Sequence, residues 1–207
     1  KKFGQKVNKI LFLNKKEFKK KYGGEHTTQG VVLTAKEFSR PTLKDFLKGE
    51  KNYNKSVIVA LDQITDPQNI GSIMRSCALF NCRGIVVSKD NSPELTPSLF
   101  KAASGAAELV NYFRVTNLKR TLSEFKKSDY WVYGFESSNT KNNELKFSSK
   151  TVLVFGSEGS GMRDLVKKEC DILLSLKSEP KLEYKIDSLN VSNASSIALY
   201  EFYKQNN

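Results

Sequence analysis

The stretch SVIVALDQITDPQNIGSIMRSCALFNCRGIVVS, residues 56–88, holds two apolar runs that flank a helical repeat. The first run, residues 57–61, is rich in β-branched residues and lacks polar alternation, as expected of a strand buried on both faces. Residues 66–69 turn the chain, and apolar residues then recur with helical spacing at positions 70, 73, 74 and 77. A second apolar run follows at residues 85–87. This order predicts two parallel strands joined by a crossover helix.

The same alternation continues to the end of the chain. Further apolar runs occupy residues 110–115, 130–135, 151–156 and 171–176, and helical patterns occupy residues 97–106, 117–127 and 191–204. We therefore predict an α/β fold, a parallel sheet with helices on both faces. In such sheets, ligands bind beyond the carboxyl ends of the strands.

The positive charge is concentrated at the start of the chain. The formal net charge is +12; residues 1–55 hold 15 Lys and Arg against five Asp and Glu, and the remainder holds 19 against 17. Residues 48–56 are polar and are predicted to be a linker, which divides the chain into domains at 1–50 and 51–207. A basic segment on a nearly neutral body indicates binding of a polyanion, and a solvated lysine-rich surface is the alternative.

Composition excludes several classes of protein. No apolar run approaches the roughly 18 residues of a membrane span, so we expect no membrane partner. The three cysteines, Cys77, Cys82 and Cys170, form no CxxC pair, and the only histidine is His26. This predicts neither a zinc site nor a disulfide framework, and a reduced intracellular protein without metal is the simplest interpretation. An enzyme of this composition must find its base somewhere other than in a core imidazole.

Three polar turns, each at the predicted end of a strand, are candidates for a site. In the first, Asn69 is predicted to cap a helix that carries Gly71 and Arg75 on one face. A glycine there would leave room for another group beside the arginine, which would hold a phosphate or an oxyanion. A capped helix with a surface arginine is the alternative.

The second turn, GSEGSG at residues 156–161, follows a buried strand and precedes a helix. Glycines permit close contact between backbone and ligand, but no GK[ST] follows, so this is not a P-loop. The carboxylate of Glu158 would repel phosphates and would suit a cofactor that offers N–H, hydroxyl or positive groups. A simple tight turn is the alternative.

The third turn, IDSLNVSN at residues 186–193, crowds Ser188, Asn190, Ser192 and Asn193 before the last helix. One of them can cap that helix, and the others would face a pocket; a redundant cap is the alternative. Three such turns on one side of a parallel sheet predict one composite pocket.

In order, DPQNIGSIMRSC (66–77), VFGSEGSGM (154–162) and SLNVSNASSIALYE (188–201) resemble the three motifs of the SpoU-type (TrmH-like) RNA ribose 2′-O-methyltransferases of the SPOUT superfamily. The resemblance covers about residues 56–207. It implies a deep C-terminal trefoil knot, S-adenosylmethionine as cofactor and a homodimer. TTQGVV, residues 27–32, is similar to the end of a small α/β L30e-like substrate-binding domain, which implies a partial copy of that domain at the start of this chain.

Site residues follow from the resemblance by motif. Arg75, Asn69, Glu158, Ser188 and Asn190 are the implied catalytic residues, with Arg75 in the place of the catalytic arginine. The implied cofactor-binding residues are Gly156, Gly159, Gly161, Leu176, Leu189 and Val191. The stretch 174–187 departs from the motif, because it is longer and more charged than its counterpart.

The resemblance implies a cytoplasmic enzyme that methylates RNA, and guanosine in large-subunit ribosomal RNA is the expected target. Methylation of transfer RNA is one alternative, and a non-catalytic RNA-binding factor for ribosome assembly is another. A nucleotide-dependent oxidoreductase on a similar sheet is disfavoured by the order of the glycines and by Glu158.

Overall fold

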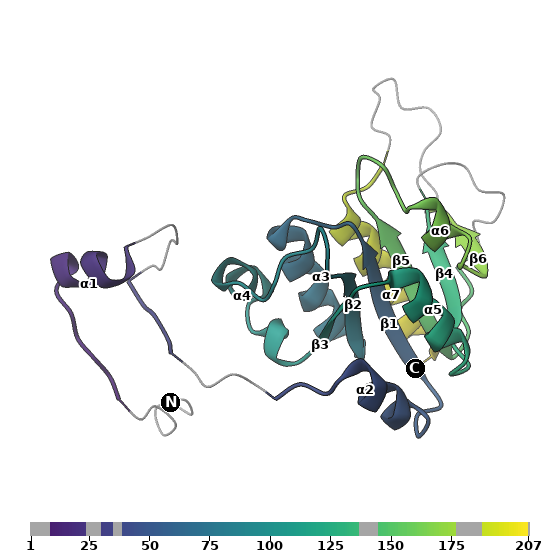
Figure 1. Cartoon of the computed structure of the whole chain (residues 1–207), viewed down its shortest axis with the longest axis horizontal. Coiled ribbons are helices and arrows are strands. Elements are labelled where there is room, and N and C mark those ends of the chain that lie inside the picture. Colours follow the sequence, from purple (N-terminus) through teal and green to yellow (C-terminus); the bar gives the residue numbers. More distant parts are fainter. Residues whose placement is uncertain (1–8, 24–29, 35–38, 137–144, 177–187, 207) are drawn as a thin grey trace. The chain divides into compact units, whose positions relative to one another are not determined.

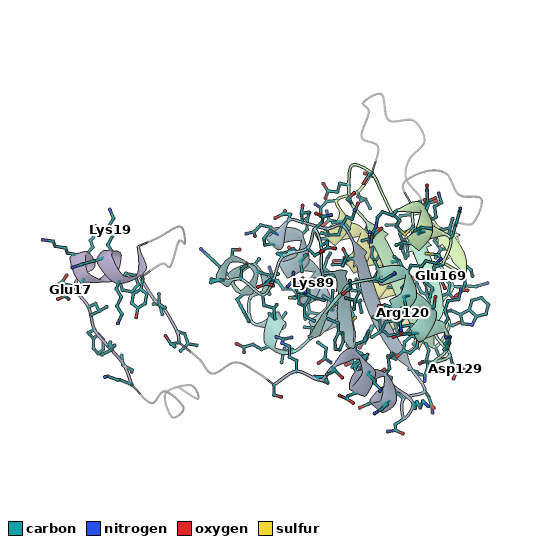
Figure 2. The ribbon with its side chains drawn as sticks, in the orientation of Figure 1. Glu17, Lys19, Lys89, Arg120, Asp129 and Glu169 are labelled. Atoms are coloured by element: carbon teal, nitrogen blue, oxygen red, sulfur yellow. The ribbon has the colours of Figure 1, made fainter. Side chains whose placement is uncertain are left out.

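A computed structural model describes residues 9–23, 30–34, 39–136, 145–176 and 188–206. The chain divides into two compact units, residues 1–38 and 39–207, and each is described by itself. In the first unit, helix α1 (Lys15–Tyr22) starts at a capping box: Asn14 Oδ1 accepts the Glu17 N–H at 2.9 Å, and the Glu17 carboxylate accepts the Asn14 N–H at 3.1 Å. No residue of α1 is buried, and Figure 2 shows Glu17 and Lys19 projecting from it.

The second unit is built on a six-stranded parallel sheet (Figure 1), as the alternation of elements predicted. The strands are β1 (Ser56–Asp62), β2 (Gly84–Ser88), β3 (Asn111–Val115), β4 (Trp131–Phe135), β5 (Lys150–Gly156) and β6 (Ile172–Leu174). Their order across the sheet is β3-β2-β1-β5-β4-β6, and every pair is parallel. The helices are α2 (Leu43–Glu50), α3 (Pro67–Leu79), α4 (Pro97–Ala103), the short 3₁₀ helix η2 (Ala106–Glu108), α5 (Leu118–Lys126), α6 (Asp164–Lys167) and α7 (Val191–Asn206).

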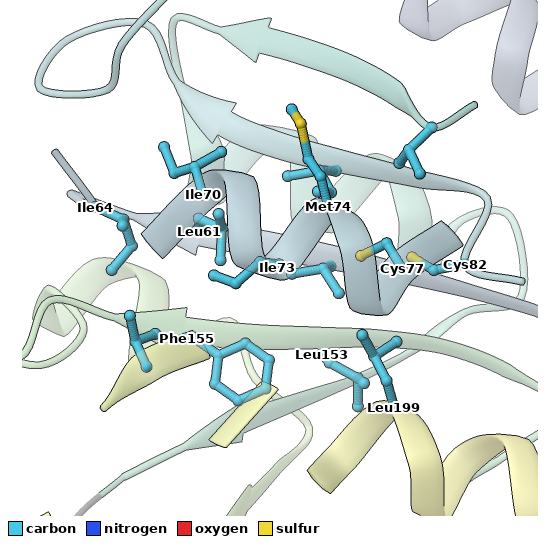
Figure 3. Packing of buried hydrophobic residues seen from close by; sticks show 14 of the residues in the cluster. Leu61, Ile64, Ile70, Ile73, Met74, Cys77, Cys82, Leu153, Phe155 and Leu199 are labelled. Atoms are coloured by element: carbon cyan, nitrogen blue, oxygen red, sulfur yellow. The ribbon is translucent and has the colours of Figure 1, made fainter. Parts of the chain in front are cut away.

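Helices cover both faces of the sheet, and each face has its own core. In β1, Val57, Val59 and Leu61 pack against α3, α4 and α7, whereas Ile58 and Ala60 pack against α2, α5 and α6. Figure 3 shows the first core, where side chains of α3 and α7 meet those of β1 and β5. Because β1 is buried along its whole length on both faces, its sequence shows no polar alternation.

Helix α2 packs within the second compact unit, which runs from Ser39 to Asn207. The Phe46 ring is buried against Phe113, with ring centroids 5.0 Å apart. The Glu50 carboxylate is 1% exposed and accepts hydrogen bonds from Tyr130 and Ser56 and from Arg83 Nε at 3.0 Å. These contacts hold α2 against the sheet. The predicted division at residues 50 and 51 placed this helix in the first domain. Whether the first unit is a partial L30e-like domain stays a prediction.

Charged side chains cover the outside of the second unit, and Figure 2 shows Lys89, Arg120 and Asp129 among them. Among the residues that the structure describes, no helix combines the length and apolar character that a membrane crossing requires.

Candidate active site at the carboxyl edge of the sheet

Side chains from all three polar turns meet at the carboxyl edge of β1 and β5. Glu158 Oε1 accepts a hydrogen bond from Asn190 Nδ2 at 2.7 Å and a longer one from Asn69 Nδ2 at 3.4 Å. Asn190 Nδ2 also donates to Asn69 Oδ1 at 2.9 Å. Glu158 and Asn190 are exposed and Asn69 is half-buried, so the cluster lies at the surface and not in the core. The structure thus brings together one side chain from each of the three turns, and the composite pocket stays a prediction.

Asn190 performs two tasks at the start of α7. Its Oδ1 accepts the Ser192 N–H at 2.9 Å and the Ser192 hydroxyl at 2.5 Å, which is the contact of a helix cap. Its Nδ2 faces the site, as described above. Ser192 supports the cap, whereas Ser188 is exposed and has no hydrogen-bond partner among the described residues. Asn190 thus both caps the helix and contacts the other site residues.

Asn69 does not cap α3, and that prediction was wrong. The cap is Asp66, whose Oδ1 accepts the Gln68 N–H at 2.9 Å, and Pro67 occupies the first helical position, where its missing N–H costs nothing. Asn69 lies in the first turn of the helix instead. Its amide is therefore available to Glu158 and Asn190.

Gly71 and Arg75 lie further along α3. A Cβ on Gly71 would lie 2.4 Å from the Ala102 Cβ, so the space that we expected beside this glycine is filled by α4 and not left for a ligand. Arg75 is exposed, and within the described part of the chain it forms no hydrogen bond or ion pair. Its guanidinium therefore keeps all its donors for a ligand.

The segment 157–161, called the glycine turn below, is a closed hairpin. Ser157 N–H donates to Gly161 O at 3.1 Å, and Gly161 N–H donates to Ser157 O at 2.8 Å. A Cβ on Gly156 would lie 2.1 Å from the Gly161 carbonyl carbon, so no larger residue fits before the turn. Gly161 has φ +68°, which favours glycine, and Gly159 is exposed with open space beside it. Glu158 stands at the tip of this rigid turn.

Asp62 and Arg163 complete the surroundings of the turn, and the motif analysis missed both. Asp62 ends β1 and is fully buried, and its carboxylate binds the Arg163 backbone N–H and guanidinium. The available signal was an acidic residue at the end of a strand predicted to be buried on both faces, which requires a partner.

The remaining predicted cofactor residues follow β6 or lie at the start of α7. Leu176 packs partly buried against the core, and Leu189 is 50% exposed. The Val191 side chain is buried, and its N–H lies 3.4 Å from Glu158 Oε1, so only its backbone reaches the site. The divergent stretch continues through 177–187, outside the described residues. In the described ranges, no three His, Cys, Asp or Glu residues are grouped to hold a metal ion.

The chain resembles known proteins over most of its length. It is 36% identical over 200 residues to "Putative TrmH family tRNA/rRNA methyltransferase YacO" of Bacillus subtilis, covering 96% of this chain and 78% of the relative. It is 37% identical over 202 residues to "23S rRNA (guanosine-2'-O-)-methyltransferase RlmB" of Pasteurella multocida, covering 95% and 79%. Both alignments therefore include the basic first unit as well as the sheet.

The fold agrees with a solved structure. The SpoU methyltransferase AviRb of Streptomyces viridochromogenes superposes with a TM-score of 0.65 at 22% identity, over 74% of this chain and 58% of that one. Residues 56–200, which contain all three polar turns, match the family described as SpoU rRNA Methylase. On this match and on the identity to its relatives, the chain belongs to the SpoU rRNA methylase family.

Proposed function

We propose that this protein transfers a methyl group from S-adenosylmethionine to the ribose 2′-hydroxyl of a guanosine in large-subunit ribosomal RNA. The relative from Pasteurella multocida carries that activity in its name. The observation that carries the proposal is the hydrogen-bonded cluster of Asn69, Glu158 and Asn190, which unites three distant motifs at the edge where parallel sheets bind ligands.

The residues at this edge fit S-adenosylmethionine. The glycine turn presents open backbone at Gly159, and the carboxylate of Glu158 suits a cofactor that is cationic and free of phosphate. Leu189 and Leu176 are only partly buried, and they would add apolar contacts to the cofactor. The AviRb structure was determined in complex with AdoMet, which is in keeping with this choice.

The bound cofactor supplies a methyl group already activated as a sulfonium, and its leaving thioether is neutral. The protein's task is therefore mainly to hold the 2′-oxygen in line with that methyl group and to help remove the hydroxyl proton. An arginine guanidinium stays protonated in proteins and is therefore a poor base. Arg75 is better suited to bind the adjacent phosphate through its fork of N–H donors and to stabilise the developing alkoxide. The proton would then leave through that phosphate or through water.

Glu158 accepts hydrogen bonds from both asparagines, and this fixes the two amides. With Asn190 Oδ1 committed to the cap of α7, the cluster holds α3, the glycine turn and α7 in one arrangement. Asn69 would thereby be presented to the target nucleotide on the same helix as Arg75. The two residues are six positions apart, which corresponds to a rise of about 9 Å along α3.

The experiment is methyl transfer from isotopically labelled S-adenosylmethionine to RNA, followed by mapping of the labelled ribose. We expect label in a guanosine of large-subunit ribosomal RNA. Label in transfer RNA alone would replace the ribosomal target and retain the chemistry. Absence of label from every RNA, with calorimetry showing no binding of S-adenosylmethionine, would favour the non-catalytic assembly factor and would overturn the proposal.

The basic first unit would grip the RNA backbone. Helix α1 exposes Lys15, Lys16, Lys19, Lys20 and Lys21, which together with the aromatic pair Phe18 and Tyr22 suit a polyanion with stacking bases. This role also accords with the similarity of residues 27–32 to the end of an L30e-like substrate-binding domain.

A homodimer is proposed from an apolar surface on α3 and α7. Leu79, Ile197 and Tyr200 are exposed, and the Tyr200 ring packs 5.8 Å from that of Phe80, which joins the two helices into one patch. Exposed apolar patches of this kind mark association surfaces. Sedimentation of the full chain should show a dimer that Tyr200→Lys weakens, and a monomeric unsubstituted protein would contradict it.

The trefoil knot is also proposed. Strand β6 lies at one edge of the sheet, whereas α7 packs against α3, β1 and β5. Asn190, directly before α7, contacts Glu158 in the turn after β5, and this return from the edge strand to the middle of the sheet supports the proposal. A cytoplasmic location fits an RNA-modifying enzyme with three free cysteines.

A further inference from the structure

The buried Asp62 and the exposed Arg163 form an ion pair, called the clamp below, at the base of the glycine turn. Asp62 Oδ2 accepts the Arg163 backbone N–H at 2.8 Å, and Asp62 Oδ1 lies 2.9 Å from Arg163 Nε and 2.7 Å from Nη2. The Asp62 side chain is fully buried, whereas that of Arg163 is 47% exposed. A buried carboxylate without a partner is strongly destabilising, and these contacts supply Asp62 with that partner.

The clamp lies where the glycine turn rejoins the sheet. Pairing of β1 with β5 ends with Asp62 opposite Gly156, the residue that enters the turn. On the exit side, a Cβ on Gly156 would lie 2.2 Å from Met162 N, so the returning backbone lies directly against the entering backbone. The next residue is Arg163, which Asp62 holds. The turn is thus fixed by sheet pairing at its entry and by Asp62 at its exit.

Packing contributes little to holding the tip of the turn. Glu158, Gly159 and Ser160 are all exposed, and the bonds inside the turn keep its shape but do not fix its direction. A pivot of the hairpin about its base would carry Glu158 away from Asn190. The contacts of Asp62 with both the backbone and the side chain of Arg163 oppose such a pivot.

We propose that Asp62 is a positioning residue that acts through Arg163 to hold the glycine turn against the sheet. The clamp keeps Glu158 in contact with Asn190 and keeps the backbone of the turn in place for S-adenosylmethionine. This inference rests on the proposed function, because it gives the turn the role of a cofactor-binding element.

A matched control is available at the opposite edge of the sheet. Arg83 Nε lies 3.0 Å from Glu50 Oε1, and the Glu50 carboxylate is 1% exposed. Arg83→Ala therefore removes an arginine from a buried carboxylate, as Arg163→Ala does, but at the amino edge of β1. If Arg163 only stabilised the fold, Arg163→Ala and Arg83→Ala should have similar effects on stability and on cofactor binding.

The test compares Arg163→Ala, Arg163→Lys and Arg83→Ala in the full chain by steady-state RNA methylation and by calorimetry with S-adenosylmethionine. We expect kcat/KM for S-adenosylmethionine to fall about tenfold to a hundredfold in Arg163→Ala, with the KM for RNA changed by less than about threefold. Arg163→Lys should recover part of the loss, because an ammonium pairs with Asp62 but lacks the fork. Arg83→Ala should lower the melting temperature and leave cofactor kinetics unchanged.

Hydrogen–deuterium exchange supplies a readout that needs neither cofactor nor activity. The amides of residues 157–162 should exchange faster in Arg163→Ala and, to a lesser extent, in Arg163→Lys, but not in Arg83→Ala. Unchanged exchange in Arg163→Ala and Arg163→Lys overturns the proposed role of the clamp. A loss of cofactor affinity in Arg83→Ala as large as that in Arg163→Ala also overturns it. An unsubstituted protein that fails to methylate RNA overturns the proposed function, and the exchange comparison then decides the clamp by itself.

Discussion

Glu158 Oε1 and Asn190 Nδ2 are 2.7 Å apart, although the two residues are 32 positions apart in the chain. Their contact joins the glycine turn after β5 to the cap of α7, and Asn69 of α3 joins both. Because Glu158 and Asn190 are exposed and Asn69 is only half-buried, we expect this hydrogen-bonded cluster to add little to folding stability. We therefore assign the cluster to the proposed site. Substitutions of its residues should affect activity more than stability.

Glu158→Gln should separate the two effects. The amide keeps the size of the side chain and one oxygen for the contacts that converge on Oε1, but it removes the negative charge that strengthens them and that suits a cationic cofactor. We expect turnover to fall by about tenfold or more and the melting temperature to change by only a few degrees. Methyl-transfer kinetics and thermal unfolding measure the two quantities. Glu108→Gln, at an exposed position on η2, is the control, and a loss of equal size there would contradict the prediction.

Arg75→Ala should nearly abolish turnover and leave the cofactor bound. If the guanidinium holds a phosphate and stabilises the alkoxide, its removal costs about a hundredfold or more in kcat. The dissociation constant for S-adenosylmethionine should stay within about threefold, since none of the implied cofactor contacts is lost. Arg75→Lys keeps the charge but loses the fork of N–H donors. Its kcat should therefore lie between those of the unsubstituted protein and Arg75→Ala. Arg120→Ala, at an exposed position on α5, controls for loss of surface charge. Near-normal turnover in Arg75→Ala rules out both proposed roles.

Much of the fold could be predicted because it depends on local patterns. Buried strands of a parallel sheet appear as continuous apolar runs, and helices between them show a 3.6-residue period, so β1, α3 and β2 were visible in residues 56–88. Which polar groups pair across the sheet has no such signature. Asp62 and Arg163 are 101 positions apart, and only the order of strands brings them together.

Local rules also failed where two residues competed for one task. Asp66 and Asn69 both have side chains that cap helices, and the earlier one forms the cap because Pro67 can occupy the first helical position. The polar stretch at 48–56 suggested a domain boundary, yet Glu50 within it is buried by Arg83, Ser56 and Tyr130. From sequence, a charged residue in a polar stretch is predicted to be exposed. Its burial depends on tertiary partners that the local sequence does not show.

The close approach of α3 and α4 predicts a cost for Gly71→Ala. The new methyl group would lie 2.4 Å from Ala102 Cβ and 2.8 Å from backbone atoms of α4, so the helices must move apart. We expect a loss of about 1–3 kcal/mol in the free energy of unfolding, measured by urea denaturation. Gly49→Ala has open space beside it and serves as the control. A neutral Gly71→Ala would show that α4 yields easily.

Stability should fall as the solution becomes alkaline. Burial raises the pKa of the Cys77 thiol well above its usual range, and it raises the pKa of Cys170 to about 12. In the unfolded chain these thiols lose their protons near pH ~8.5, so above that pH the unfolded state binds fewer protons than the folded state. The stabilisation is complete below this pH and declines above it, by at most about 1.4 kcal/mol per pH unit for each thiol.

Urea denaturation at several pH values between 8 and 10.5 measures that slope. Cys170→Ala should make it shallower by removing one titrating group, at the cost of a small cavity. A slope that is the same with and without Cys170 would contradict the assignment.

Removing residues 1–38 should weaken RNA binding and leave the second unit folded. The first unit contributes the exposed lysines of α1, and each phosphate that they neutralise releases counterions, so affinity for RNA should fall about tenfold or more and depend less steeply on salt. Affinity for S-adenosylmethionine should be unchanged. Titrations of a fluorescent RNA at several salt concentrations, beside calorimetry with the cofactor, measure both.

A deletion of residues 1–50 is the informative comparison. It also removes Phe46 and Glu50, exposing Phe113 and leaving Arg83 and Tyr130 without their shared partner. The free energy of unfolding should then fall by at least about 3 kcal/mol relative to the shorter deletion, because a buried aromatic side chain and a buried hydrogen-bond network are lost together. If both deletions are equally stable, α2 is not part of the second unit. If neither alters the dissociation constant for RNA, the basic first unit does not grip the substrate.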